Sequence, residues 1–222
     1  MDSCAALAGL RVVDFSNVRS GAQASQTLAD FGAEVVHIET PGGSALRGSP
    51  AWPFWARGKK SLPLDLKDPD DLAAARRLAS RADVVIETFR PGVADRLGIG
   101  YAALSAENPR LVYASVTGFG RQGPLADLQG YEGVVFAKFG VFGAVNDLGR
   151  REGPAFCSAA YASYPASQLT IQAILAALYE RERSATTQRV QATGAILMES
   201  LPEQLAVALV NRYLELKRSG RF

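Results

Sequence analysis

Short apolar runs alternate with helical segments along the first part of the chain. Residues 10–15 (LRVVDF) form a β-branched, apolar run that predicts a buried strand. Residues 22–31 carry apolar side chains at helical spacing, and Gly32 follows as a typical helix terminator. Residues 34–39 (EVVHIE) predict a second strand. Strand, loop, helix and strand with short connections make up the unit from which parallel sheets are built.

The same alternation continues to about residue 120. Asp68 and Pro69 are a typical N-cap and first-turn residue, so a helix is expected to begin there. The pattern predicts in order a strand at 62–66, a helix at 69–80, a strand at 83–87, a short helix at 91–97 and a strand at 110–116. This order predicts an α/β fold with a Rossmann-like, doubly wound and mostly parallel sheet, followed by helices.

The later part of the chain has a different character. Residues 130–143 are rich in glycine and phenylalanine and fit either a helix or an ordered loop. A helix is expected at 166–183, a strand at 188–191 and an amphipathic helix at 200–218. We expect the apolar faces of both helices to be covered by a partner chain, because an uncovered apolar stripe of that size favours association.

Composition narrows the functional classes. The 222 residues are 48% hydrophobic and 21% charged, which excludes a disordered chain, and no apolar run is long enough to span a bilayer. A net charge of +2 gives no reason to expect a nucleic-acid surface, and a single histidine, His37, excludes a multi-His metal site. Cys4 and Cys157 are far apart and no leader peptide is visible, so we expect reduced thiols in a cytoplasmic protein.

Three segments can be weighed as candidates for ligand binding. Glu39 ends the second strand, as the acid of a dinucleotide site does, but the loop at 16–21 has one glycine and lacks the G-x-G-x-x-G fingerprint. Residues 87–93 (ETFRPGV) lead from a strand end into a helix start, where backbone amides favour anions, and Arg96 follows on the same helix. The alternative is a solvated arginine after an ordinary turn. The aromatic residues at 52–55 could stack a planar ligand or simply pack in a loop.

Six motifs occur in order along the chain. They are LAGLRVVDF at 7–15, LADFGAEVVHIE at 28–39, GKKS with LDLK at 58–67, ADVVIE with FRPGV at 82–93, NPRLVY to GFGRQGP at 108–124, and ILAAL with Arg181. Together they resemble the family III CoA-transferases, the group that includes formyl-CoA transferase, carnitine CoA-transferase and α-methylacyl-CoA racemase. The resemblance covers nearly the whole chain.

The resemblance implies a domain organisation and partners. Family members have a Rossmann-like large domain and a small domain, and two chains thread through one another. We therefore expect residues 8–195 to form an incomplete large domain and residues 196–222 a helical connection towards a small domain that this sequence lacks. The implied ligands are coenzyme A, bound as acyl-CoA, and a carboxylic acid, without a metal. The implied partner is a second copy or a sister subunit, with neither nucleic acid nor membrane.

The resemblance also implies a mechanism, which this sequence only partly supports. In the family an aspartate attacks the acyl-CoA thioester and forms a mixed anhydride, which CoA thiolate reopens. Counting back from the ILAAL motif places Ser163 or Ala162 at that position, and no Asp or Glu occurs from residue 153 to residue 179. Glu132 matches the acid of the transferase branch. Tyr131 stands where the racemase branch has histidine, which argues against racemase chemistry.

The positions implied to contact CoA retain binding groups. They are Val18, Arg19, Ser20, Leu64, Lys67, Thr88, Phe89, Val93 and Arg96. Arg96 and Lys67 offer positive charge to the CoA phosphates. Two hypotheses remain open at this point: a CoA-transferase that needs a partner chain to supply its nucleophile, or a catalytically inactive CoA-binding subunit or truncated pseudo-enzyme.

Overall fold

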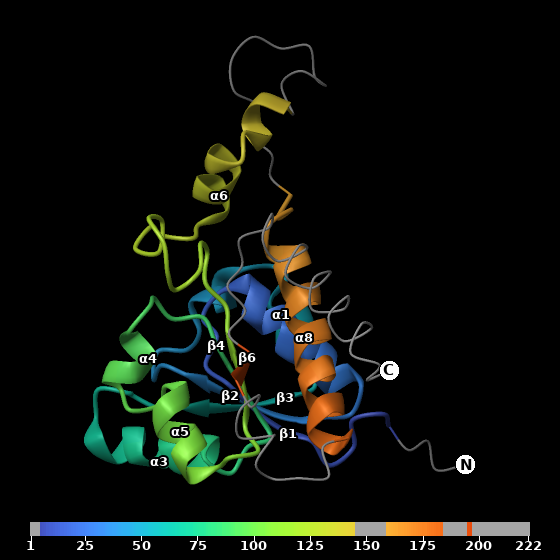
Figure 1. The fold of residues 1–222 in the computed structure, drawn as a ribbon, viewed down its shortest axis with the longest axis vertical. Coiled ribbons are helices and arrows are strands. Elements are labelled where there is room, and N and C mark those ends of the chain that lie inside the picture. The colour runs from blue at the N-terminus through green and yellow to red at the C-terminus, as the bar shows by residue number, and fades with distance from the viewer. Residues whose placement is uncertain (1–4, 145–158, 184–194, 197–222) are drawn as a thin grey trace.

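A parallel β-sheet organises the chain in the computed structural model, which describes residues 5–144, 159–183 and 195–196 (Figure 1). All of its strand pairs are parallel, and the strand order is β3-β2-β1-β4-β5-β6. The strands are β1 (Arg11–Asp14), β2 (Glu34–Glu39), β3 (Lys59–Pro63), β4 (Val84–Glu87), β5 (Val112–Ser115) and β6 (Ala195–Ile196). The predicted Rossmann-like, doubly wound sheet is confirmed.

The strand order places a topological switch point between β1 and β4. Val12 pairs with Val35 of β2 on one side and with Val84 of β4 on the other. The chain therefore builds the sheet outward from β1 in one direction, and then returns to build from β4 in the other. Loops that follow two such central strands diverge at the carboxyl edge, and α/β proteins bind ligands in the crevice that this creates.

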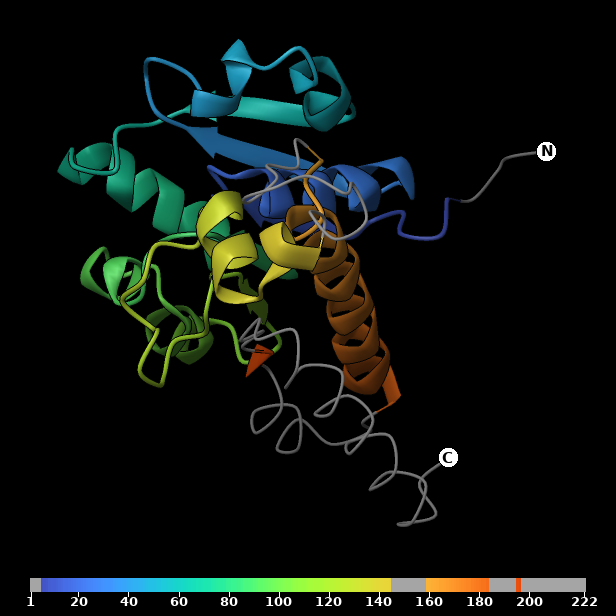
Figure 2. The same cartoon turned by 90° about the horizontal axis from the view of Figure 1, so that it is seen from above.

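Helices cover both faces of the sheet (Figures 1 and 2). Alternate strand residues point to opposite faces, so Val12, Val84 and Ile86 pack beneath one helical layer while Val13 and Val85 pack beneath the other. The first layer holds α1 (Arg19–Asp30) and α8 (Ser163–Arg183), and the second holds α3 (Pro69–Ala79), α4 (Val93–Arg96) and α5 (Tyr101–Glu107).

The direction of α8 matters for the candidate site. Near its end, Arg181 contacts the Asp83 carboxylate at 3.4 Å and donates to the Arg110 carbonyl at 3.2 Å, and both partners precede strands. The C-terminal end of α8 therefore lies at the amino edge of the sheet, and its first residue, Ser163, lies towards the carboxyl edge. Figure 1 shows this end of α8 directed towards α6 (Glu132–Lys138).

The buried face of α8 corrects one expectation. Ile171, Ile174 and Leu178 pack with Leu28 of α1 and with residues of the sheet. This face is covered within the chain and needs no partner. The corresponding expectation for residues 201–216 concerns a segment outside the described residues, as do the predicted strand at 188–191 and the predicted helix at 200–218.

Most predicted elements are present, with shifted bounds. The strand predicted at 62–66 lies at 59–63 because its ladder with β2 begins at Lys59, opposite Val35. Asp68 caps α3 as predicted, since its side chain accepts hydrogen bonds from the amides of Asp70 and Asp71. The ambiguous segment at 130–143 contains helix α6. The pattern missed a 3₁₀ turn, η1 (Ala45–Gly48), and two short helices, α2 (Trp52–Ala56) and α5.

Candidate CoA site and acyl-transfer site

Two loops meet at the switch point. The Thr88 hydroxyl accepts a hydrogen bond from the Asn17 amide at 3.1 Å and donates one to the Asn17 side-chain oxygen at 3.0 Å. Phe15 and Phe89 pack with ring centroids 6.3 Å apart. The structure thus brings the segment that carries Val18, Arg19 and Ser20 against the loop that carries Thr88 and Phe89.

Gly21 permits this close approach. A Cβ atom at this position would lie 2.4 Å from Ser16 Cβ and 2.7 Å from Thr88 Cγ2, closer than real Cβ contacts. A larger residue would push the β4–α4 loop away from α1. Gly21, which the sequence pattern placed in the first loop, therefore lies in the first turn of α1 and permits close packing of α1 against the β4–α4 loop.

The start of α1 is suited to an anion. Its N-cap residue, Val18, makes no side-chain hydrogen bond to the first turn. The backbone N–H groups of that turn therefore receive no side-chain cap, and they give the helix start a partial positive charge. Arg19 lies in the first turn, with its guanidinium 5.4 Å from the centroid of the buried Trp55 ring. Stacking on Trp55 orients the Arg19 guanidinium while leaving its charge uncompensated by any acid in the described part of the chain.

The other predicted CoA contacts differ in exposure. Leu64 is buried in the core, so little of its side chain faces a ligand. Lys67 and Arg96 are exposed, and neither forms an ion pair within the residues that the structure describes. Val93 is half-buried in α4, which begins after Gly92 in the left-handed conformation at φ 79°. All of these residues follow β1, β3 or β4 and therefore belong to the carboxyl edge.

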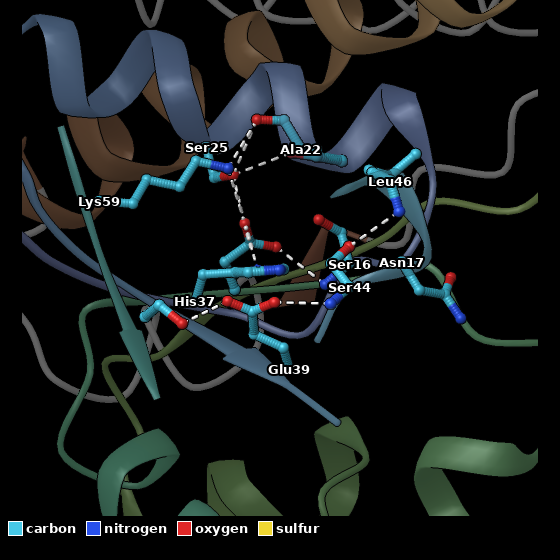
Figure 3. Close-up of polar contacts among 12 residues, drawn as sticks. Ser16, Asn17, Ala22, Ser25, His37, Glu39, Ser44, Leu46 and Lys59 are labelled. Carbon is cyan, nitrogen blue, oxygen red and sulfur yellow. Dashed lines mark hydrogen bonds and ion pairs between the residues drawn. The ribbon is translucent and has the colours of Figure 1, made fainter. Parts of the chain in front are cut away.

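A buried cluster of charged and polar residues around Asp14 holds the loop that follows β1 (Figure 3). Asp14, fully buried at the end of β1, accepts hydrogen bonds from Ser25 Oγ at 2.5 Å, Lys59 Nζ at 3.0 Å and the Ser16 amide at 2.8 Å. His37 Nδ1 lies 3.2 Å from the same carboxylate. Burial opposes ionisation of Asp14, but Lys59, His37 and Ser16 together lower its pKa well below the usual value. Asp14 thus joins β1, α1, β3 and the first loop.

In a dinucleotide site the acid at the end of the second strand binds a ribose, whereas Glu39 binds groups of its own chain. Its carboxylate accepts hydrogen bonds from Arg47 Nε at 2.8 Å and Nη2 at 2.6 Å and from the Ser61 hydroxyl. It also accepts one from the Ser44 amide at 2.6 Å (Figure 3). The hydrogen bonds from Arg47 outweigh burial and lower the pKa of Glu39 to about 2. Glu39 stands where a dinucleotide-binding site has its acidic residue, but here its hydrogen bonds stabilise the turn between β2 and η1.

Glu87 anchors the second loop. It is buried at the end of β4, and its carboxylate accepts a hydrogen bond from the Phe89 amide at 2.7 Å. Burial raises the pKa of Glu87, while hydrogen bonds from Ser115 and from the Phe89 amide oppose the rise. Glu87 therefore positions the turn that presents Thr88 and Phe89.

A second cluster joins Glu132 to the start of α8. The Glu132 carboxylate accepts hydrogen bonds from the Ala162 amide at 2.6 Å, the Ser163 amide at 3.2 Å and the Ser163 hydroxyl at 2.5 Å. The structure thus brings together the acid and both residues that sequence counting placed at the nucleophile position. His37 lies in the Asp14 cluster, on β2, and takes no part in the contacts of Ser163.

A glycine pair positions Glu132. Gly118 follows β5 and Gly130 precedes α6, and a Cβ atom on Gly118 would lie 2.1 Å from Gly130 Cα. The two backbones therefore touch. Phe136 is buried one turn further along α6 and packs at 6.3 Å from Tyr161. These two contacts hold the start of α6 against the start of α8.

Sequence reasoning missed the Asp14–Lys59 pair and the Arg19–Trp55 stack. The pattern identified VVDF as part of a strand and GKKS as part of the resemblance, but nothing local shows that Asp14 and Lys59 are buried together. Among residues 5–144, 159–183 and 195–196, no three His, Cys, Asp or Glu side chains gather as a metal-ligand set. Within the same ranges, no helix combines the length and apolar character that a bilayer span requires.

Comparison with known proteins decides the family. The family model described as CoA-transferase family III matches residues 7–216. The chain belongs to the family III CoA-transferases. It is 37% identical to the succinate–glutarate CoA-transferase of Agrobacterium fabrum, over 97% of this chain and 56% of that protein. It is 38% identical to human α-methylacyl-CoA racemase, over 84% of this chain and 47% of that protein.

Solved structures agree with the sequence comparison. The crystal structure of Rv3272 from Mycobacterium tuberculosis in its orthorhombic form superposes with a TM-score of 0.78 at 33% identity, covering 96% of this chain and 58% of that one. A CAIB/BAIF family protein from Brucella suis gives a TM-score of 0.75 at 29% identity, covering 97% of this chain and 58% of that one. This family III chain thus spans about half the length of the curated relatives it matches.

Proposed function

We propose that this chain binds acyl-CoA at the carboxyl edge of its sheet and contributes to CoA transfer between carboxylic acids. The observation that carries the proposal is the joining of the two switch-point loops through Asn17 and Thr88. This contact holds the start of α1, which carries Arg19, against the β4–α4 loop, which leads to Arg96 in α4. Unpaired cations and a helix start at one edge suit the phosphates of CoA.

Transfer itself needs a group that this chain lacks at the expected place. Position 163 is a serine whose hydroxyl is bonded to Glu132, and residues 153–179 contain no acid. We therefore propose that CoA transfer requires a second polypeptide, either a sister subunit or another copy, that supplies a carboxylate. The second candidate function, a CoA-binding subunit without transferase activity, is favoured by the same serine and would need no such partner for its role.

Calorimetric titration with CoA tests the binding proposal. The wild-type chain should bind CoA, and Arg96→Ala should weaken binding by about 1.5–3 kcal/mol, the range for hydrogen bonds to charged groups. Arg77→Ala is the matched control, because Arg77 is an exposed arginine late in α3, which runs towards the amino edge. Equal affinity of both variants would mean that Arg96 is a solvated arginine without a phosphate partner, and no binding at all would overturn the proposed function.

A further inference from the structure

The Ser163 hydroxyl and the Glu132 carboxylate have the geometry of a nucleophile and its base. Ser163 Oγ lies 2.5 Å from Glu132 Oε2, so the hydroxyl donates a short hydrogen bond directly to the carboxylate, as proton transfer to a general base requires. We propose that Ser163 attacks the thioester of acyl-CoA with Glu132 as general base, so that this chain hydrolyses acyl-CoA through an acyl-serine. The proposal rests on the proposed function for the binding of acyl-CoA.

Glu132 is held so that one oxygen faces the serine. Its Oε1 accepts a hydrogen bond from the Ala162 amide at 2.6 Å, and Oε2 accepts one from the Ser163 amide at 3.2 Å. These bonds fix the carboxylate by two backbone groups, so its orientation does not depend on the serine side chain. A third group that orients the base is the arrangement by which other serine nucleophiles are activated.

The place of the pair in the fold suits attack on a bound thioester. Ser163 begins the 21-residue helix α8 at the carboxyl edge, where the helix dipole favours the negative charge that develops on a tetrahedral intermediate. Ser163 is half-buried, and its neighbours Tyr161 and Tyr164 are exposed, as is Tyr131 beside Glu132. These tyrosines each lie within two residues of Glu132 or Ser163 in the sequence, and exposed aromatic side chains offer apolar surface to an acyl chain.

The chemistry balances without any further reagent than water. Ser163 Oγ forms a bond to the thioester carbonyl carbon as its proton passes to Glu132, and the C–S bond breaks. CoA leaves as the thiolate and takes the proton from Glu132. Water then attacks the serine ester, giving its proton to Glu132, and the ester oxygen leaves with that proton. The products are a carboxylic acid and CoA, and Ser163 and Glu132 are regenerated.

The same reasoning explains why hydrolysis would replace transfer. An aspartyl anhydride is activated enough for CoA thiolate to reopen it, whereas a serine ester retains the poorer alkoxide leaving group. An acceptor carboxylate cannot displace that group readily, but water can, with Glu132 as base. A carboxylate is a weaker base than histidine, so we expect turnover well below the enzyme median of about 10 s⁻¹.

Acid quenching during turnover tests the proposal. The full 222-residue chain is incubated with an excess of a medium-chain acyl-CoA, and quenched samples are examined by intact mass and peptide mapping. We expect acid release, and an acyl group on the peptide that contains Ser163. Ser163→Ala should abolish the adduct and lower acid release at least about 100-fold, the minimum that acid–base catalysis usually contributes. Unchanged hydrolysis in Ser163→Ala would overturn the proposal.

Two further variants separate the possible failures. Glu132→Gln should lower hydrolysis about as much as Ser163→Ala, and its melting temperature reports whether the start of α8 stays folded. An acyl group trapped by hydroxylamine on Glu132 would overturn the proposal, because the glutamate would then be the nucleophile. Calorimetric binding of CoA without any acylation would contradict this inference alone, whereas absence of CoA binding would also remove the proposed function.

Discussion

At the scale of single residues, the buried ion pair between Asp14 and Lys59 is a feature on which we expect stability to depend. Asp14 is fully buried and the Lys59 side chain is 5% exposed, and the two form an ion pair at 3.0 Å. Removing one partner of a buried pair leaves an uncompensated charge and destabilises a protein by about 3–5 kcal/mol. Lys59 also donates to the Ala22 carbonyl at 2.7 Å, which ties β3 to α1.

We therefore predict that Lys59→Met strongly lowers the free energy of unfolding, by about 3 kcal/mol or more. Lys60→Met is the matched control, because the neighbouring Lys60 pairs with Glu34 at the exposed edge of the sheet. Exposed pairs contribute little, so this variant should melt close to the wild type. Urea unfolding of the three proteins measures both effects. Equal stability of the two variants would show that Asp14 does not depend on Lys59.

Glu87 gives a prediction about pH. Burial raises its pKa in the folded protein above the ordinary value of 4.5, so the folded state holds the proton more tightly than the unfolded state does. This contribution to stability is complete below pH 4.5 and is lost as the pH rises through the folded pKa. Glu87→Gln cannot ionise, and its melting temperature relative to the wild type should rise between about pH 4.5 and 7.

Scanning calorimetry across this pH range checks the Glu87 prediction. Glu180→Gln, on an exposed position of α8, provides the control and should show no such trend. A melting-temperature difference between Glu87→Gln and the wild type that stays constant with pH would contradict the assignment.

At the scale of elements, the sheet was predictable and the short connecting helices were not. The four-residue strands β1, β4 and β5 are almost wholly buried, and such strands consist of apolar runs that sequence patterns detect. Helices α2 and α5 have five and seven residues, too short to show a helical period. The β3 shift has another cause, because Lys59 is a buried lysine whose partner, Asp14, is 45 residues away.

The Gly118–Gly130 contact predicts how α6 is positioned. Gly118→Ala would place a Cβ atom 2.1 Å from Gly130 Cα, and neither backbone can yield without moving α6. We expect faster hydrogen exchange of the Ala162 and Ser163 amides, because their acceptor, Glu132, begins α6. The control is Gly133→Ala within α6, where an added Cβ meets nothing within 4 Å.

The control variant should be neutral or more stable, because alanine favours a helix over glycine by about 0.5–1 kcal/mol. The Gly118 account fails if the two substitutions leave exchange of the Ala162 and Ser163 amides equally slow. It also fails if Gly133→Ala has the larger effect.

At the scale of the whole molecule, exposed tyrosines gather at one end. Tyr131, Tyr161 and Tyr164 are 63%, 61% and 46% exposed, and each lies within two residues of Glu132 or Ser163 in the sequence. Exposed aromatic surface of this kind marks interaction sites. We expect this end to mediate association of the chain with a second copy, which light scattering at tens of micromolar should detect.

Tyr161→Ser should shift the association equilibrium towards monomer. Tyr179→Ser serves as control, because Tyr179 is equally exposed, at 63%, near the opposite end of α8. A wild-type chain that remains monomeric would contradict the prediction. Association that Tyr161→Ser leaves unchanged would place the interface elsewhere.

The sequence separation between contacting residues decides which parts of the candidate site could be predicted. The loop with Phe89 was predictable as a candidate ligand loop because it follows a recognisable strand, whereas Arg19 became a candidate only through the family resemblance. The connection between the two segments through Asn17 and Thr88 spans 71 residues, and the Glu132–Ser163 bond spans 31. Neither contact leaves a local pattern. The resemblance supplied positions 132 and 163, but only the structure shows that their side chains touch.

The central claim, that CoA binds where the two switch-point loops meet, is tested most directly by hydrogen exchange with and without saturating CoA. The account predicts slower exchange in peptides covering residues 15–22 and 87–97, which hold the start of α1 and the β4–α4 loop. It predicts no change in peptides covering residues 76–83 and 107–111, which precede β4 and β5 at the opposite edge. Protection confined to the opposite edge, or absent from both loops while CoA is bound, would contradict it.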